Sequence, residues 1–320
     1  MTWIDTDIDG PVIVVRAIHF AAMAMMTGAV VFRAAVAEPA LRSIPKARAV
    51  INSQIRRLAW IGLAIGVISG AIWLVLLTAS LSNESFREML VSGALRDVLT
   101  LTQFGAMAQI RLALAILLAI SLAFDGFRWG RWFALVAAPA LTVSAAWTGH
   151  AAATPHGLGY IHLVSDALHL SAASAWIGGL LPLVLVLHAI RQDRPLAWPP
   201  PELVAVRRFS ALGVASVAAL MISGAINSWI LVGSFRGLIL TVYGRVLMLK
   251  IAVFAIMLAV AAVNRLCLTP ELASAPGGGV QQEALRRLTR NTIIEIALGL
   301  LVFAIVGLLG TLHPAAHLVH

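Results

Sequence analysis

Long apolar runs, separated by short polar segments, dominate the chain. Windows of about 19 residues pick out eight of them, near residues 12–37, 58–80, 102–123, 132–149, 160–188, 209–232, 244–266 and 292–312. A helix that crosses a bilayer needs about 20 consecutive apolar residues. The pattern therefore predicts an all-α, polytopic integral membrane protein with eight transmembrane helices.

Composition supports this prediction and narrows the function. The 320 residues are 60% hydrophobic and 12% charged, whereas soluble domains carry about 25% charged residues, so a soluble enzyme is excluded. The net charge of +9 comes from Lys and Arg in the loops, where positive charge sets membrane orientation. We expect the lipid bilayer as a partner and no nucleic acid. The single cysteine, Cys267, excludes an internal disulfide and a Cys-rich metal centre.

Positive charge clusters after the first, third, fifth and seventh runs. These residues are Arg42, Lys46, Arg48, Arg56 and Arg57; Arg128 and Arg131; Arg191, Arg194, Arg207 and Arg208; and Arg265, Arg286, Arg287 and Arg290. The positive-inside rule places these loops in the cytoplasm, so both termini are expected outside, in the periplasm of a bacterial cell. The first run is interpreted as a span and not as a signal peptide, because acidic residues precede it and it contains Arg16 and His19.

The chain resembles itself when shifted by about 150 residues. The sequence Ile-Ser-Gly-Ala-Ile at 68–72 recurs at 222–226. Further matched pairs are Arg16 with Asp166, His19 with His169, Met26 with Trp176, Gly28 with Gly178, Thr102 with Thr241, Gly105 with Gly244, and Arg111 with Lys250. We predict two parallel four-helix repeats, residues 1–150 and 151–320, related by a pseudo-twofold axis along the membrane normal. A functional site is expected where the two repeats meet.

Histidine is distributed unevenly across the predicted membrane. Apart from His188, the histidines map to the outer half or beyond it, namely His19, His150, His156, His162, His169, His313, His317 and His320. Neutral imidazole is a common ligand for copper, zinc and iron. This clustering indicates a metal site on the extracytoplasmic side.

Helical spacing arranges the candidate ligands in two stripes. His19, Met23 and Met26 stand at i, i+4 and i+7, and so do His162, Asp166 and His169. The nitrogen and thioether of the first stripe suit Cu(I), while the nitrogen and carboxylate of the second suit Cu(II) or zinc. If the repeats bring runs one and five together, His19 would face His169 and Arg16 would face Asp166.

A structural interpretation stays open for each candidate. The two methionines could simply pack, His19 and His169 could bond across helices, and Asp166 could only neutralise Arg16. The remaining histidines could be ordinary loop or tail residues. Arg111 and Lys250 could snorkel to the outer headgroups or tune the field over the site. Close helix approach is the expected role of Gly70, Gly178, Gly179 and Gly224. We expect Glu295 to pair with Arg290 or Arg207 at the inner boundary.

Several spaced motifs resemble one known family. They are Thr148-Gly149-His150-Ala151, Asp166-Ala-Leu-His169, Trp176-Ile-Gly178-Gly179-Leu180, Arg208-Phe209-Ser210, Ser223-Gly224, Tyr243-Gly244 with Lys250, Asn264-Arg265, and Arg290 with Glu295. This set is similar to the copper resistance protein D (CopD) family of bacterial inner-membrane proteins, most densely from about residue 145 to 312. The resemblance implies copper movement toward the cytoplasm, often beside a small periplasmic copper-binding protein of the CopC type. It carries over His150, Asp166, His169, Trp176 and the two glycines.

These observations together predict a copper permease and not an enzyme. Copper would be captured on the periplasmic side at a His/Met/Asp site between the first and fifth spans, and released through weak, exchangeable ligands. A membrane cytochrome is an alternative, with haem held by His19 and His169 or by His150 and His313. A copper sensor or assembly factor that does not transport is the other.

Overall fold

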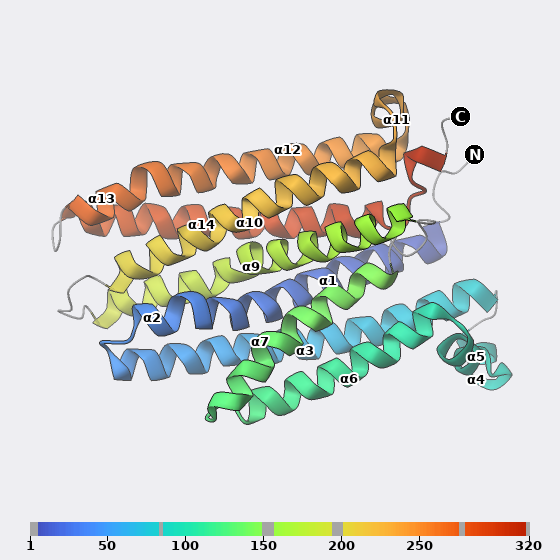
Figure 1. Cartoon of the computed structure of the whole chain (residues 1–320), viewed down its shortest axis with the longest axis horizontal. Helices are drawn as coiled ribbons and strands as arrows, with labels where there is room; N and C mark the ends of the chain where they lie inside the picture. The colour runs from blue at the N-terminus through green and yellow to red at the C-terminus, as the bar shows by residue number, and fades with distance from the viewer. Residues whose placement is uncertain (1–5, 83–85, 149–156, 194–200, 275–278, 318–320) are drawn as a thin grey trace.

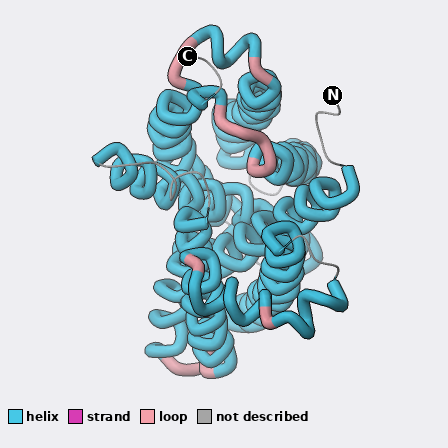
Figure 2. The backbone as a smooth tube through the Cα atoms, turned by 90° about the vertical axis from the view of Figure 1, so that its right-hand side faces the viewer, coloured by secondary structure: helices cyan, strands magenta, loops and turns pink. Residues whose placement is uncertain are grey.

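The structure is a computed structural model that describes residues 6–82, 86–148, 157–193, 201–274 and 279–317. Within these ranges every regular element is helical (Figures 1 and 2). The long helices are α1 (Thr6–Phe32), α3 (Pro45–Ser82), α6 (Gln103–Ala123), α7 (Arg128–Val143), α9 (Gly157–Asp193), α10 (Pro201–Val232), α12 (Val242–Val263) and α14 (Gly279–Leu309). Helices suit lipid because each backbone N–H and C=O finds its partner within the same segment.

Short elements join or extend the long helices. They are η1 (Arg33–Ala37), α2 (Glu38–Ala40), α4 (Phe86–Ser92), α5 (Ala94–Leu101), η2 (Ser144–Thr148), α11 (Phe235–Leu240), η3 (Asn264–Leu268), α13 (Thr269–Ser274) and η4 (Ala315–His317). Two of them are π-helical and prolong a membrane helix. In η1 the N–H of Glu38 bonds to the carbonyl of Arg33, and in η3 the N–H of Thr269 bonds to the carbonyl of Asn264.

Seven of the described helices are long and apolar enough to cross a membrane. They occupy residues 10–40, 45–82, 103–123, 158–190, 201–232, 242–273 and 279–309. The exception is α7, whose 16 residues give a length of about 24 Å against a hydrocarbon core of about 30 Å, and whose last turn passes into the 3-10 helix η2. The predicted count of eight spans is therefore not confirmed.

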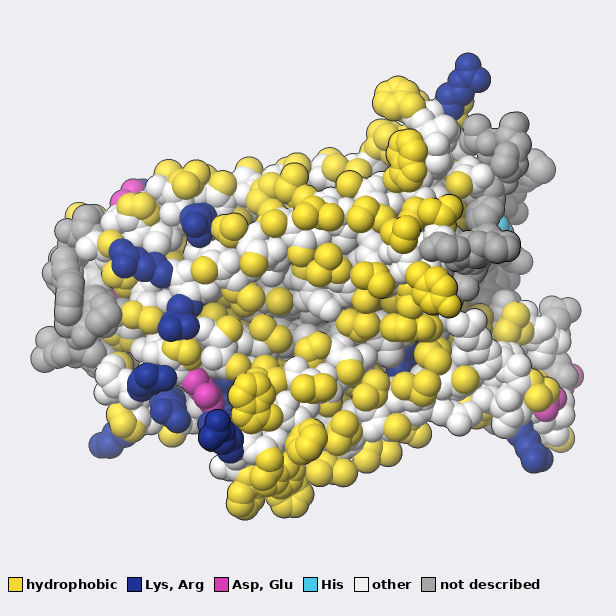
Figure 3. Space-filling model, viewed as in Figure 1, with side chains coloured by type: hydrophobic (Ala, Val, Ile, Leu, Met, Phe, Trp, Pro, Cys, Tyr) yellow, Lys and Arg dark blue, Asp and Glu magenta, His cyan; other side chains and the backbone are white. Residues whose placement is uncertain are grey.

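The surface has the pattern of a membrane protein. Large apolar side chains are exposed along the helices, and Figure 3 shows them covering the middle of the molecule, whereas most of the Lys and Arg side chains on this face gather at the end where α2 and α13 lie. Exposed apolar side chains face hydrocarbon without cost in a bilayer, and positive charge gathers on the cytoplasmic side. The end bearing α2 and α13 is called the basic end below.

Helices α1 and α9 form the centre of the bundle (Figure 1). Their backbones touch where Gly28 meets Gly178, since a Cβ added to Gly178 would lie 1.8 Å from the carbonyl oxygen of Ala24. Helix α1 packs further on α3 and α7, and α9 packs on α10 and α14. Gly178 permits this close approach because it has no side chain.

Helices α6 and α12 begin with the same local structure. Thr102 and Thr241 are their N-caps, and each side-chain oxygen accepts a hydrogen bond of 3.0 Å from the backbone N–H of Gly105 or Gly244. Both glycines lie directly against the preceding short helix, α5 or α11. The matched threonines therefore cap a helix, and the matched glycines contact the preceding short helix, in each half of the chain. The arrangement as two four-helix repeats stays a prediction.

Candidate functional site

His19 is held in one orientation by helix α3. Its side chain is 1% exposed, and its Nδ1 lies 3.1 Å from the carbonyl oxygen of Gly66 and 3.1 Å from Oγ of Ser69. The Ser69 hydroxyl donates its own hydrogen to the carbonyl of Ile65 at 2.6 Å. Both neighbours of Nδ1 therefore accept, so Nδ1 carries the proton and Nε2 keeps a free lone pair. Nε2 is buried and has no hydrogen-bond partner in the described part of the chain.

His169 has the same arrangement on helices α9 and α10. Its Nδ1 lies 3.0 Å from Oγ of Ser223, and the Ser223 hydroxyl donates to the carbonyl of Ala219 at 2.6 Å. Ser223 must then accept from His169, so this ring is also protonated on Nδ1 and presents Nε2 as an acceptor. Two residues matched by the internal repeat thus have the same tautomer for the same reason.

Gly70 and Gly224 make room for these two rings. A Cβ added to Gly70 would lie 3.3 Å from Cε1 of His19, and one added to Gly224 would lie 3.6 Å from Cε1 of His169. We expected these glycines to bring helix backbones together. Instead each accommodates an imidazole, because the serine before it in the Ile-Ser-Gly-Ala-Ile motif draws the ring onto that face of the helix.

The predicted pairing of the two histidines across α1 and α9 is not what the hydrogen bonds indicate. His19 is bound to α3, and His169 is bound to α10. Among the described residues, no group of three or more His, Cys, Asp or Glu side chains is placed to hold a metal ion. The arrangement is therefore one of two oriented imidazoles in separate halves.

The predicted ion pair between Arg16 and Asp166 is wrong. The Arg16 guanidinium lies 4.7 Å over the ring of Trp73, and it also lies against Gly310, just beyond the end of α14, where helix carbonyls carry partial negative charge. Asp166 instead accepts a hydrogen bond of 3.1 Å from Asn227 Nδ2. The two residues lie on helices that touch, but Arg16 is directed toward α3 and α14, whereas Asp166 is directed toward α10.

The charges around the two histidines differ. Arg16 and Arg111 both act electrostatically on His19, whereas Lys250 acts on His169 and also on Asp166. Two cations therefore act on the imidazole of the first half, and one cation acts on that of the second. A metal cation is repelled less at His169 than at His19.

Arg111 is tied to neighbouring backbone and hydroxyl groups. It donates to Oγ of Ser144 at 3.2 Å, to the carbonyl of Ser144 at 3.1 Å and to Oγ1 of Thr148 at 2.6 Å. We expected it to snorkel toward outer headgroups. These three bonds instead fasten η2 to α6, immediately before the segment that contains His150.

Met23 and Met26 lie in the interface with α3. They are 4% and 0% exposed. The sulfur of Met23 lies 3.5 Å from where a Cβ on Gly66 would be, and the Cβ of Met26 lies 2.9 Å from where a Cβ on Gly62 would be. The stripe predicted as ligands thus packs on the glycine face of α3, with His19 at its outer end. The structure supports packing as the role of both methionines.

The remaining candidates are dispersed. His150 and His156 lie outside the described residues. His162 is buried on α9, His313 is exposed beyond α14, and His317 ends η4. Trp176 is 2% exposed, with its ring 6.0 Å from that of Phe254 in an edge contact. Gly179 faces the ring of Phe209, which a Cβ would approach to 2.7 Å.

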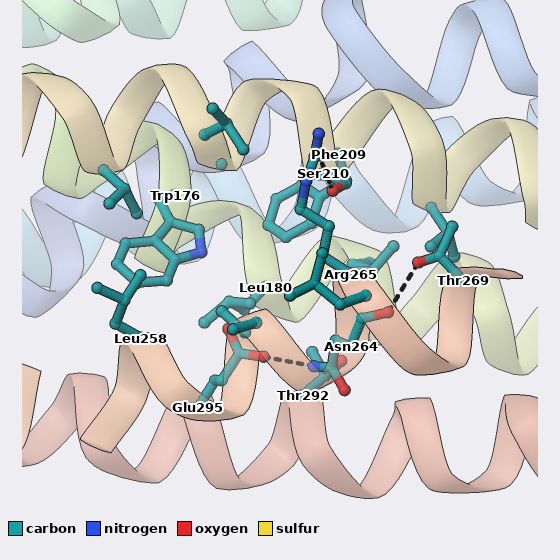
Figure 4. A pocket seen from close by; sticks show the side chains of 18 of the residues that line it. Trp176, Leu180, Phe209, Ser210, Leu258, Asn264, Arg265, Thr269, Thr292 and Glu295 are labelled. Atoms are coloured by element: carbon teal, nitrogen blue, oxygen red, sulfur yellow. Dashed lines mark hydrogen bonds between the residues drawn. The ribbon is translucent and has the colours of Figure 1, made fainter. Parts of the chain in front are cut away.

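Two polar networks at the basic end were not predicted. Glu295, expected to pair with an arginine, accepts a hydrogen bond of 2.6 Å from Asn264 Nδ2 (Figure 4). Asn264 Oδ1 in turn accepts one of 2.9 Å from Asn291. In the other half Arg33 pairs with Asp125 and, at 3.3 Å, with Glu38. Each network begins at the first residue of a π-helical segment, which the sequence pattern does not reveal.

Sequence reasoning also missed the serines that orient the histidines. Ser69 and Ser223 stand at the same place in the repeated Ile-Ser-Gly-Ala-Ile motif, 50 and 54 residues after their histidines. The repetition of a polar residue within an apolar run was the available signal, because a buried hydroxyl in a membrane helix needs a partner.

Comparison with known proteins covers most of the chain. The profile described as "Copper resistance protein D-like, N-terminal domain" matches residues 6–160, and that of "Copper resistance protein D" matches residues 203–309. Copper resistance protein D of Pseudomonas syringae pv. tomato is 28% identical over 268 residues, which cover 80% of this chain and 82% of that protein. No solved structure matches the chain.

Two further relatives are longer than the matched region. Copper transport protein CutJ of Bacillus subtilis is 34% identical over 182 residues, covering 54% of this chain and 32% of CutJ. Inner membrane protein YebZ of Escherichia coli is 32% identical over 166 residues, covering 52% of this chain and 54% of YebZ. Together with the helical membrane fold and the matched polar motifs, these similarities mean that the chain belongs to the copper resistance protein D family.

Proposed function

We propose that this protein moves copper across the bacterial inner membrane, taking it up on the periplasmic side and releasing it toward the cytoplasm, as part of copper homeostasis or resistance. Relatives named for copper resistance and copper transport support the cargo. The orientation follows from the positive charge at the basic end, and it puts both termini and the two oriented histidines toward the periplasm.

The orientation of His19 and His169 is the observation that carries the proposal. A histidine that binds a metal through one nitrogen almost always donates its other N–H to an oxygen, which fixes the tautomer and the direction of the ring. Both residues have this arrangement. Within the described residues, the Nε2 of His19 is buried without a hydrogen-bond donor. A copper ion bound there would use a lone pair that no hydrogen bond satisfies.

The second half is the better place for capture of a cation. Asp166 lies one turn before His169 on α9, so a nitrogen and a carboxylate are available close to each other. This pair suits Cu(II). A site with few protein ligands also suits a transporter, because an ion that is held by a complete ligand set is not released.

Delivery of copper from a separate periplasmic protein of the CopC type completes the proposal. The family resemblance is its basis, and the outer end of α9, with His162 toward the membrane surface from Asp166 and His169, is where a donor would release the ion. His162 is buried in the described structure, so copper would enter along α9 only with a local rearrangement there.

Uptake of copper into proteoliposomes tests the proposal. We expect His169→Ala to reduce uptake at least tenfold and His19→Ala to reduce it as well. His188→Ala is the matched control, because it removes an imidazole from the same helix at the basic end, where the side chain is exposed. Unchanged uptake in His169→Ala protein that remains folded would refute transport through this site. An absorption spectrum with a Soret band would instead identify a haem protein.

A further inference from the structure

Two cavities adjoin between helices α10 and α12 at the basic end. The deeper has a volume of about 370 Å³ and is lined by residues of α9, α10, α12, η3, α13 and α14. The shallower has a volume of about 680 Å³ and is lined by residues of α10, η3 and α13. They share Ser210, Arg265, Leu266 and Thr269, so one continuous groove leads from the end of the bundle into its apolar middle.

The groove exists because α10 and α12 pack on other helices. Helix α10 packs mainly on α9, and α12 packs mainly on α14. Small residues line the facing sides, including Gly213, Ala218 and Ala261, and the π-helical turn η3 follows immediately after α12. The two helices therefore leave between them a space that no described side chain fills.

The walls of the deep cavity are apolar over most of their length. Trp176, Val217, Met221 and Leu258 are among the lining residues, and Figure 4 shows Trp176 and Leu258 at one end of the cavity and Arg265 and Thr269 at the other. Glu295 lies on the inner wall, where Asn264 binds its carboxyl oxygen. An occupant of this cavity is thus an apolar chain.

The mouth of the groove has two guanidinium groups, for which the described part of the chain offers no acidic partner. Arg265 donates to Oγ of Ser210 at 2.5 Å, which fixes its direction between η3 and α10. Arg207 lies one turn before Ser210 on α10 and is exposed. Neither takes part in the ion pairs of the described residues. Two arginines without acidic partners suit a phosphate group, because the guanidinium fork matches its oxygen atoms in geometry and charge.

We propose that this groove binds an anionic phospholipid, with the phosphate between Arg207 and Arg265 and one acyl chain in the deep cavity. The depth of the groove in the membrane matches that of a phospholipid. The arginines lie at the basic end, at the level of the cytoplasmic headgroups, and the cavity extends from there toward the bilayer centre, where acyl chains lie. Basic pockets between membrane helices on that side recognise such lipids. A free phosphate would leave the apolar cavity unused, so the lipid is the better occupant.

The proposal is tested by lipid binding to the purified full-length protein. Native mass spectrometry, with phosphatidylglycerol and phosphatidylcholine supplied in equal amounts, measures which lipid is retained. We expect the wild type to retain phosphatidylglycerol at least tenfold better and the double variant Arg207→Gln, Arg265→Gln to lose this preference. The control Arg42→Gln, Arg57→Gln removes the same charge at the same end from the other half, and we expect it to behave as wild type.

A second variant separates a lipid from a soluble anion. Ala218→Phe places a ring in the deep cavity while both arginines remain, and we expect it to reduce retention of phosphatidylglycerol about tenfold. Retention that is unchanged in Ala218→Phe and is abolished by added inorganic phosphate would overturn the lipid assignment in favour of a phosphate site. If both double variants lost the preference for phosphatidylglycerol equally, the preference would come from general surface charge, and this result would also overturn the lipid assignment. Copper transport is not used in either measurement, so the outcome is independent of the proposed function.

Discussion

Removal of one hydroxyl tests whether the ring of His169 is held ready for a metal. In Ser223→Ala the acceptor 3.0 Å from Nδ1 is lost, and the described residues offer His169 no second acceptor. A hydrogen bond of this kind contributes about 1 kcal/mol net. Substitution of such supporting residues lowers metal affinity about 10–100-fold, which corresponds to roughly 1.4–2.7 kcal/mol. We expect copper affinity to fall within that range while the helix remains intact.

The corresponding change in the other half should have a smaller effect. In Ser69→Ala the Nδ1 of His19 keeps the carbonyl oxygen of Gly66 at 3.1 Å, so the ring retains one of its two acceptors and its tautomer. We expect copper affinity to fall less than in Ser223→Ala. The difference follows only from the hydrogen bonds, since the same residue type is changed at matched positions of the repeated motif.

Competition with chelators of known affinity for Cu(I) and Cu(II) measures both effects in purified protein. Ser171→Ala is the matched control, because the Ser171 hydroxyl bonds only to the carbonyl of Ala167 in its own helix, at 2.8 Å. Wild-type affinity in Ser223→Ala, or a larger loss in Ser69→Ala than in Ser223→Ala, would show that the serines do not orient metal ligands.

Two further predictions concern stability. Gly178→Ala forces a Cβ to within 1.8 Å of the backbone of α1, so we expect it to cost about 1–3 kcal/mol of stability and to lower the midpoint of thermal unfolding in detergent. Gly126→Ala, with nothing within 4 Å of the added atom, should leave the midpoint unchanged. Equal midpoints for the two variants would contradict the direct helix contact. Asp125→Asn removes one of the two acidic partners of Arg33, whose side chain is only 14% exposed, and denaturant unfolding should report a loss of roughly 1–3 kcal/mol. Removal of the exposed Glu283 from its helix pair should cost less than about 0.5 kcal/mol, and a larger loss there would refute the role assigned to burial.

The apolar runs predicted most of the fold, because the length of a membrane helix is set by the thickness of the bilayer. Seven runs became helices of sufficient length. The run at 132–149 forms a shorter α-helix than the other seven, since Pro139 lies within α7 and the last turn tightens into the 3-10 helix η2. The local signals that end an α-helix are weaker in the sequence than hydropathy, so the pattern of apolar residues could not show where α7 ends.

The candidate site was predicted in its residue types but not in its geometry. The sequence placed His19 and His169 at matched positions, and the structure gives both the same kind of partner. It could not show which neighbour each helix face meets, because rotation about the helix axis depends on packing. The methionine stripe meets glycines of α3, and Arg16 is directed away from Asp166, for that reason.

The wide turn η1 changes which faces α1 and α2 present to their neighbours. A π-helical turn holds one residue more than an α-helical turn, and one residue corresponds to a rotation of about 100°. Met23, before the turn, faces α3, and Glu38, after it, reaches Arg131 of α7 at 3.3 Å. Deletion of a single alanine from 34–37 would remove the extra residue and rotate α2 about the helix axis relative to α1 by about 100°, without any change in charge. The extra residue thus allows a single continuous helix to contact α3 before the turn and α7 after it.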